Sequence, residues 1–397
     1  MSEDAPGTAV PRVGLLYDSV SANTGDIAIG IAGAQELARH GLADVTVLDP
    51  FAPATDSVDA VVVGGGELIR PIGDAFYDVF RLAGGTVLNS AGVWQAAEGL
   101  ELFKDYAVVS ARSSVEAEVL SRYVDDVRVV PDTTTTMESA PYRIPGVEDG
   151  EPVVGVHVVP HTLALCPDLV ELIDAIPHKK VFIPFTHYNY DDSFMRAVPF
   201  DRTNATFLPR LSPLELHGAI GGLTYVVTSS LHASLFAYSQ SVPFATVHQE
   251  KVWNYFSDRG LQRLVFRSCA ELRAALEEIE AGEVDLAGLV AADKAAVRAA
   301  YADYAAAIRH RAGHRSVPRS APVSSELQSE RLTSSQREGV IHNRDSVLHQ
   351  LYLRVLTAER GERVWHDEAD RLAARVAELE AAAAVPADQP GSPGTVG

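Results

Sequence analysis

Short apolar runs separated by helix-length segments constrain the fold of this chain more than any other feature. In the first part of the chain, runs rich in valine and other apolar residues occur at 13–17, 45–48, 58–63, 86–89, 107–109 and 127–130. Helical patterns lie between them, at 27–39, 74–82 and 114–123. Strands that do not alternate polar and apolar residues are buried on both faces, which is typical of a parallel sheet covered by helices. The pattern predicts an α/β domain at 12–145, preceded by a disordered N-terminus at 1–11.

The same pattern starts again after a polar, turn-rich stretch, YRIPGVEDGEP, at 142–152. Strand patterns follow at 153–158, 180–183, 225–228, 243–247 and 263–266. Helical patterns follow at 167–176, 213–219, 231–239, 250–257, 270–281 and 293–310. Two α/β halves of similar size predict two doubly wound, Rossmann-like domains, the second at 150–312. In such folds, ligands bind at the carboxyl ends of the strands, so we expect the site on the loops that lead into helices.

The end of the chain has a different composition. A segment rich in Ser, Pro and Arg, 313–345, predicts a linker. Helical periodicity returns at 346–384, which predicts a C-terminal helix that supports a homo-oligomer or docks on a partner. The last residues, 385–397, predict a disordered tail.

Charge and composition exclude several classes of function. The formal net charge of -20 disfavours a nucleic-acid-binding surface and docking on an anionic membrane, because both partners are negatively charged. The sequence has neither a signal-peptide pattern nor an apolar run long enough for a transmembrane segment. The two cysteines, Cys166 and Cys269, lack metal-ligand spacing and do not indicate a disulfide framework. Together these features favour a cytoplasmic protein.

Two loops of the first half could hold an anion. Asn23-Thr24-Gly25-Asp26 follows the first strand and opens a helix, so it offers backbone N–H groups and the positive end of the helix dipole. Helix capping alone is the alternative. In the second loop, Gly65 and Gly66 belong to a triple-glycine run that lets the backbone approach a ligand, although a tight turn would use the same residues. The run does not match the dinucleotide fingerprint.

Three charged or titratable side chains lie at predicted strand ends. Arg112 would project from its strand toward the site, where a guanidinium suits a phosphate or carboxylate; the alternative is an ordinary surface Arg. His232 lies in the first turn of an apolar helix, where it is either an acid or base or a structural residue. Lys251 lies near a helix start, which disfavours a cation and hints at an anionic ligand; the alternatives are pairing with Glu250 or solvation.

The other histidines give weaker signals. His157 and His161 end the first strand of the second half, and His187 precedes Asp191 and Asp192. The last three could bind a metal or orient a sugar hydroxyl, but their spacing is no metal motif. The sequence therefore predicts neither a metal nor a cofactor.

Taken in order, these segments resemble the polysaccharide pyruvyl transferase family over about 13–280. The resemblance rests on Asn23–Asp26, Val61–Gly66, Arg112 with Ser114, Val129–Asp132, Leu231-His232 with Ala237, and Val242-Pro243 through Lys251. One position departs from the pattern, because Ser230 stands where the family usually has Arg. Either an anion contact is missing, or Arg112, Lys251 or another cation replaces it.

The resemblance implies a GT-B-like pair of domains and a transferase that uses phosphoenolpyruvate. The enolpyruvyl unit would join two hydroxyls of a sugar or polysaccharide as a cyclic pyruvate ketal, with phosphate released. His232 would be the catalytic acid or base. The substrate-binding candidates are Arg112, Lys251, Asn23, Gly25, Asp26, Gly65, Gly66 and Ser230. Two alternatives remain: a nucleotide-sugar glycosyltransferase of the same architecture, and a non-catalytic relative that acts as an assembly partner.

Overall fold

The computed structural model describes residues 10–314 except 22, 149 and 187–190. Most of the predicted N-terminal segment, the linker beyond residue 314, the predicted helix at 346–384 and the predicted tail lie outside the described residues. The two predicted α/β halves lie within them.

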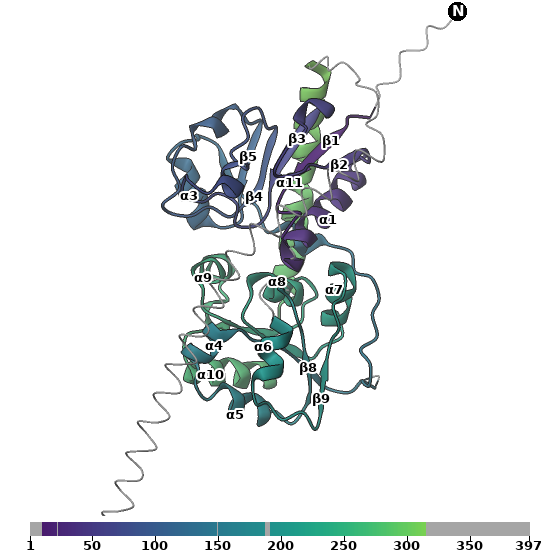
Figure 1. Ribbon diagram of the computed structural model, residues 1–397, viewed down its shortest axis with the longest axis vertical. Coiled ribbons are helices and arrows are strands. Elements are labelled where there is room, and N and C mark those ends of the chain that lie inside the picture. Colours follow the sequence, from purple (N-terminus) through teal and green to yellow (C-terminus); the bar gives the residue numbers. More distant parts are fainter. Residues whose placement is uncertain (1–9, 22, 149, 187–190, 315–397) are drawn as a thin grey trace, which may run out of the picture. The chain divides into compact units, whose positions relative to one another are not determined.

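The first half forms a sheet of six parallel strands in the order β2-β1-β3-β4-β5-β6 (Figure 1). The strands are β1 (Val13–Leu16), β2 (Val45–Val47), β3 (Ala60–Gly64), β4 (Val87–Ala91), β5 (Val108–Ala111) and β6 (Val127–Val129). Val13 at the start of β1 lies opposite Val45 on one side and Ala60 on the other. This register aligns the carboxyl ends of β1 and β3, so the loops after them share one edge of the sheet.

The second half forms another six-stranded parallel sheet, in the order β12-β11-β10-β7-β8-β9. The strands are β7 (Val153–His157), β8 (Lys179–Phe182), β9 (Ala205–Phe207), β10 (Tyr225–Thr228), β11 (Phe244–Val247) and β12 (Val265–Phe266). Thr228 at the end of β10 lies opposite His157 at the end of β7. The predicted pair of doubly wound α/β halves is confirmed.

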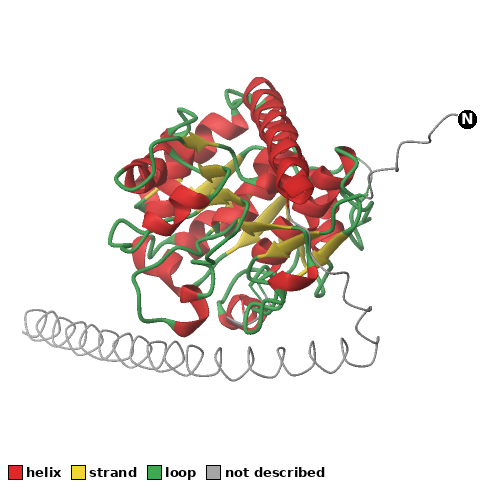
Figure 2. Ribbon diagram, turned by 90° about the horizontal axis from the view of Figure 1, so that it is seen from above, coloured by secondary structure: helices red, strands yellow, loops and turns green. Residues whose placement is uncertain are grey.

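Helices connect the strands and lie on both sides of them (Figure 2). The α-helices of the first half are α1 (Thr24–Arg39), α2 (Ala75–Asp78) and α3 (Ser114–Ser121). The later ones are α4 (Pro160–Leu165), α5 (Leu169–Asp174), α6 (Asp191–Ala197), α7 (Pro213–Gly221), α8 (Leu231–Ser239), α9 (Glu250–Ser257), α10 (Cys269–Glu280) and α11 (Ala287–His314). Short 3-10 turns are η1 (Thr55–Ser57), η2 (Glu101–Asp105), η3 (Thr133–Thr136) and η5 (Gln262–Leu264).

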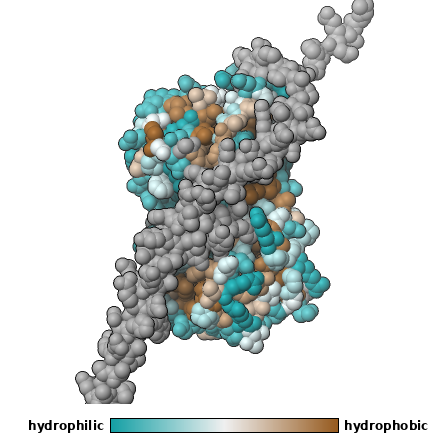
Figure 3. Space-filling view, viewed as in Figure 1, coloured by the Kyte–Doolittle hydropathy of each residue, from teal (hydrophilic) through white to brown (hydrophobic). Residues whose placement is uncertain are grey.

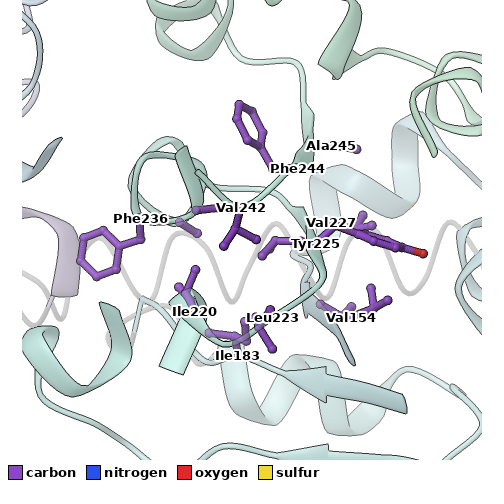
Figure 4. Packing of buried hydrophobic residues seen from close by; sticks show 14 of the residues in the cluster. Val154, Ile183, Ile220, Leu223, Tyr225, Val227, Phe236, Val242, Phe244 and Ala245 are labelled. Carbon is purple, nitrogen blue, oxygen red and sulfur yellow. The ribbon is translucent and has the colours of Figure 1, made fainter. Parts of the chain in front are cut away.

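The core of the second half shows why these strands read as unbroken apolar runs. Val154, Val227 and Phe244 come from three neighbouring strands and are fully buried (Figure 4). Phe236 of α8 and Ile220 of α7 cover them from the helix layer. Each such side chain gains about 1.5–3 kcal/mol on leaving water. Helix α8 has no solvent-facing stripe, because all of its residues are buried.

The last described helix, α11, returns to the first sheet (Figure 1). Its Tyr301 accepts a hydrogen bond from Asn89 Nδ2 (3.1 Å), and its Tyr304 hydroxyl lies 2.6 Å from Ser110 Oγ. Val297 and Ile308 join the same apolar cluster as the first strand. The sequence pattern groups this helix with the second half, and Val290 near its start does belong to that core, whereas the rest of its buried residues pack with the first sheet.

Three short elements and one covalent bond differ from the sequence-based expectations. Strand β9 has three residues, α4 has six and precedes the predicted helix at 167–176, and α6 has seven, so none of them gives a clear periodic signal. The expectation of no disulfide is wrong, because the structure joins Cys166 to Cys269. Their separation of 103 residues hides the pairing, which depends on the fold placing the end of α4 beside the start of α10.

The surface carries few large exposed apolar side chains. Figure 3 shows hydrophilic and hydrophobic residues intermixed on the face that it draws. Among the described residues, the large exposed ones are Val10, Val47, Ile72, Trp94, Val129 and Leu289. None of the described helices is both long enough and apolar enough to cross a bilayer.

Candidate functional site

The loop after β1 leads into helix α1, which begins at Thr24, earlier than the predicted helix at 27–39. Asn23 is the N-cap, and its Oδ1 accepts a hydrogen bond from the Gly25 amide (3.0 Å). The Asn23 backbone also forms an isolated antiparallel bridge with Thr186, which follows β8. The first turn of α1 is therefore tied to the second half, and both predicted roles of Asn23, capping and proximity to a site, are compatible with this placement.

Gly25 lies directly against His232. A Cβ added to Gly25 would lie 2.2 Å from both Cγ and Nδ1 of the imidazole, far inside van der Waals contact. His232 occupies the first turn of α8, immediately after the carboxyl end of β10. The glycine is thus required by close approach rather than by its backbone angles, and it brings the N-terminal turn of α1 to the imidazole ring.

The other side of His232 faces Asp132. His232 Nε2 lies 3.6 Å from Asp132 Oδ2, and both side chains are buried. Neither of these two atoms has a hydrogen-bond partner among the described residues. Asp132 is fixed by its other oxygen, which accepts hydrogen bonds from Thr134 N (2.9 Å) and Thr134 Oγ1 (2.7 Å).

Asp132 is held as a carboxylate. Burial alone would raise its pKa, but the nearby His232 and the Thr134 hydrogen bonds outweigh this and hold the pKa below its ordinary value. A carboxylate at this distance can orient the imidazole ring, as in other acid–base pairs. The pair can therefore move a proton within the buried end of the site.

The triple-glycine run brings backbone close to the first turn of α1. Gly64, Gly65 and Gly66 all have positive φ, of 129°, 83° and 77°. A Cβ at Gly66 would lie 2.6 Å from Asp26 Oδ1, and one at Gly65 would lie 1.9 Å from Ile29 Cγ2. The run is thus both the tight turn and the close approach that the sequence left open.

Asp26 is a carboxyl whose pKa is raised by its surroundings. Burial raises its pKa to about 6, and the neighbouring charge of Asp18 acts in the same direction. The neighbouring His232, Lys251 and Arg112 side chains oppose the shift. These influences show that the segments after β1 and β5 share one electrostatic environment with the first turns of α1, α8 and α9.

Lys251 reaches across from the second half to the loop after β3. Its Nζ lies 3.4 Å from Glu67 Oε2, and about a third of its side chain is exposed (34%). Glu67 also lies 3.8 Å from Arg70 Nη2. Burial would raise the pKa of Glu67, but Lys251, Arg112 and Arg70 hold it below its ordinary value. Lys251 therefore pairs with Glu67, an alternative to Glu250 that sequence spacing does not reveal.

Arg112 is neither an open anion clamp nor a surface residue. It is 1% exposed, and its Nε donates to Glu116 Oε1 at 3.0 Å. Its Nη2 lies 3.0 Å from the same oxygen but lacks the alignment of a hydrogen bond. The carboxylate raises the pKa of the guanidinium above its already high value, against the effect of burial. The guanidinium thus forms a buried ion pair and packs against Gly92, and its predicted role in substrate binding stays a prediction.

Ser230, the residue at the departure from the family pattern, begins α8 as its N-cap. Its side chain makes no capping hydrogen bond, while its backbone N–H donates to Thr228 Oγ1 at 3.3 Å. Ser230 is partly exposed. Its short hydroxyl therefore supplies a polar atom but no charge.

The weaker histidine candidates divide into structural and surface positions. His157 Nε2 lies 2.9 Å from Asp191 Oδ2 in a buried pair, and the ring Nδ1 lies 3.2 Å from Thr228 Oγ1. His161 is exposed. Asp192 pairs with Arg196, and His187 lies outside the described residues. Among the residues that the structure describes, no group of three or more His, Cys, Asp or Glu could hold a metal ion.

The structure adds three acidic residues to the sequence-based candidates. Asp132, Glu67 and Glu116 contact His232, Lys251 and Arg112 respectively. Two of them had a signal in the sequence, because Asp132 ends a strand in Val129–Asp132 and Glu67 directly follows the triple-glycine run. Glu116 had only its i, i+4 spacing from Arg112 on the start of a helix.

The two parallel sheets, with polar side chains gathered where their strands end, define a GT-B-like α/β protein. Solved structures share this fold. A Listeria monocytogenes protein assigned as a UDP-N-acetylglucosamine 2-epimerase is 11% identical, with a TM-score of 0.50, covering 79% of this chain and 100% of that one. Staphylococcus aureus MnaA with UDP (12%, TM-score 0.46, covering 77% and 95%) and the calicheamicin glycosyltransferase CalG4 (13%, 0.42, covering 78% and 100%) are more distant.

The family follows from the sequence rather than from these structures. The profile of the polysaccharide pyruvyl transferase family matches residues 23–247, more than half of the chain, and the chain belongs to this family. The matched region begins at the N-cap of α1 and ends at the last residue of β11. A search of curated proteins found no significant match.

Proposed function

We propose that the chain transfers an enolpyruvyl group from phosphoenolpyruvate to two hydroxyls of a sugar or polysaccharide. The observation that carries this proposal is the meeting of His232 with Asp132 on one side and Gly25 of α1 on the other. A buried acid–base pair is thereby placed beside a helix N-terminus, where the dipole favours an anion. Membership of the family supports the same reaction class.

The donor requires cations, and the cations of the site are already paired. Lys251 is the more accessible one, and its partner Glu67 is held 3.4 Å away in a part-buried position. We expect the donor phosphate or carboxylate to replace Glu67 as the partner of Lys251. Arg112 stays with Glu116 and contributes through its field rather than by direct contact.

In the proposed reaction, two sugar hydroxyls each give up one proton and form one new bond to the donor. One proton reaches the methylene carbon of the donor and converts it to a methyl group, while C2 gains bonds to both sugar oxygens. The bond between C2 and the phosphate oxygen breaks, and phosphate leaves with the second proton. His232 is the proposed acid and base for these transfers, with Asp132 stabilising its charged form. Asn23, Gly25, Asp26, Gly65, Gly66 and Ser230 are the proposed lining of the donor site.

Calorimetry and phosphate release test the proposal together. The full chain should bind phosphoenolpyruvate, and Lys251→Met should weaken binding about tenfold or more, since a charged hydrogen bond contributes about 1.5–3 kcal/mol. The matched control is Lys104→Met, because Lys104 is exposed on η2. His232→Ala should abolish phosphate release in the presence of glycans, while His161→Ala should leave it unchanged.

Two results would redirect the assignment. Binding of a nucleoside diphosphate without binding of phosphoenolpyruvate would favour a glycosyltransferase. Binding of neither, with a partner enzyme retained by the full chain, would favour a non-catalytic assembly role. The proposed cytoplasmic location and homo-oligomer are tested separately, by fractionation and by comparing the mass in solution of the full chain with that of a chain ending at residue 314.

A further inference from the structure

A stack of aromatic and guanidinium groups lies beside the site on the first half. The Arg70 guanidinium carbon lies 3.6 Å from the ring centroid of Tyr77 and 5.4 Å from that of Trp94. Trp94 is 43% exposed. Tryptophan has the largest side chain of the standard residues and is highly buried on average, so this exposure is unusual. We refer to Trp94, Arg70 and Tyr77 as the Trp94 platform.

Backbone hydrogen bonds fix the platform to the ends of the central strands. The segment after β3 and the segment after β4 continue side by side in parallel, with Ile69 paired to Val93. Ile69 N donates to Gly92 O (3.1 Å), and Trp94 N donates to Ile69 O (2.9 Å). Arg70 Nε donates to Glu67 O at 3.2 Å. The indole and the guanidinium are thus held on paired backbone rather than on a free loop.

The platform is continuous with the proposed catalytic site. Glu67 lies between Arg70 Nη2 (3.8 Å) and Lys251 Nζ (3.4 Å). Gly92, two residues before Trp94, lies close to the buried Arg112 and donates a backbone hydrogen bond to Gly66 O (2.7 Å). A molecule on the platform would therefore lie next to the residues proposed to hold the donor.

We propose that the Trp94 platform binds a neutral pyranose unit of the glycan acceptor. The C–H face of a pyranose is apolar and flat, so it gains from covering an exposed indole, while its hydroxyls take hydrogen bonds from a fixed guanidinium. The pairing of Arg70 with Glu67 leaves little net positive charge and favours a neutral sugar over an anionic one. This inference rests on the proposed function, because it identifies the acceptor side of the same site.

Binding of the full chain to an array of immobilised glucosyl, galactosyl, mannosyl and N-acetylhexosaminyl glycans tests the platform. Trp94→Ala should lower binding to the preferred glycan about tenfold or more, and Trp94→Phe should retain most of it, because an aromatic face remains. Ile72→Ala is the matched control, since Ile72 is an exposed apolar residue (63%) of the same region. Arg70→Gln should weaken binding, whereas Arg196→Gln, at the distant Arg196–Phe207 stack, should not.

The binding of phosphoenolpyruvate by the same variants separates this inference from the proposed function. We expect its dissociation constant to change less than about twofold in Trp94→Ala and Trp94→Phe. Equal glycan binding by Trp94→Ala and wild type, with donor binding intact, would overturn the platform and leave the proposed function standing. Binding of no glycan by a wild-type chain that binds the donor would also overturn it. Trp94-dependent glycan binding without donor binding would support the platform and refute the donor.

Discussion

Replacement of Gly25 by alanine tests whether the position of His232 matters for activity. The added Cβ would lie 2.2 Å from the imidazole, more than 1 Å short of the 3.4 Å at which ordinary contact begins. His232 or the first turn of α1 must therefore move by about that amount. A displacement of about 1 Å in a reacting group lowers the rate about 100-fold.

The same substitution has a small predicted effect on folding, which makes the test informative. Alanine is favoured over glycine inside a helix by about 1 kcal/mol, and Gly25 has no positive φ that would oppose it. Overpacking opposes this gain by about 1–3 kcal/mol. We expect a net destabilisation of at most about 2 kcal/mol together with the large loss of rate.

The assay is phosphate release at saturating phosphoenolpyruvate and glycan, with urea unfolding of the same samples. Gly288→Ala is a matched control, because Gly288 is also the second residue of a helix and an added Cβ there meets nothing within 4 Å. A Gly25→Ala protein that is folded and fully active would refute the reasoning, since it would show that the observed place of His232 is not needed.

Three further predictions concern the charged groups. Burial raises the pKa of Asp26 to about 6, so the folded state binds more protons than the unfolded state, and the free energy of unfolding should fall by on the order of 3 kcal/mol as the pH rises from 3.8 through about 6. Asp26→Asn should lack this pH dependence in urea unfolding, and an identical pH dependence in the variant would contradict the assignment. Asp132→Asn should lower kcat about 100-fold or more and alter the pH profile that reports His232, whereas an unchanged profile would exclude their coupling. Arg112→Met should cost about 3–5 kcal/mol in urea unfolding by leaving Glu116 unpaired, and the double variant Arg112→Met/Glu116→Leu should recover most of the loss; additive losses would argue against the pair.

The fold was predictable because its signal is local and repeated. Apolar runs such as Val58–Val63 and Val153–Val158 can be buried only between two helix layers, and their alternation with helices leaves few arrangements. Elements without periodicity escaped this reasoning, as β9 did with its three residues. The return of α11 to the first sheet also escaped it, because tyrosine contacts such as Tyr301 with Asn89 join residues over 200 positions apart.

The sequence predicted which loops carry the candidate site residues, but not which side chains pair with one another. Sequence reasoning placed His232, Lys251 and Gly25 at strand ends, and the structure brings their loops together. It could not show that Lys251 meets Glu67, because that contact joins residues 184 positions apart. It also could not show that Arg112 is buried, because the sequence is the same whether an arginine at a strand end faces solvent or pairs with a carboxylate four residues later.

The pairing of these cations has a consequence for selectivity. A site with unpaired positive charges would bind any small anion, whereas here the proposed donor must compete with Glu67 for Lys251, while Arg112 stays paired with Glu116. The Lys251 pair is 3.4 Å long and partly exposed, so it is the easier one to exchange, while removal of a partner from the buried Arg112 pair would be costly. Only a ligand whose charge and shape offset the lost Lys251–Glu67 ion pair would stay bound. Ser230 adds no charge at the start of α8, so we expect the arrangement to favour a strongly charged anion over a weak one.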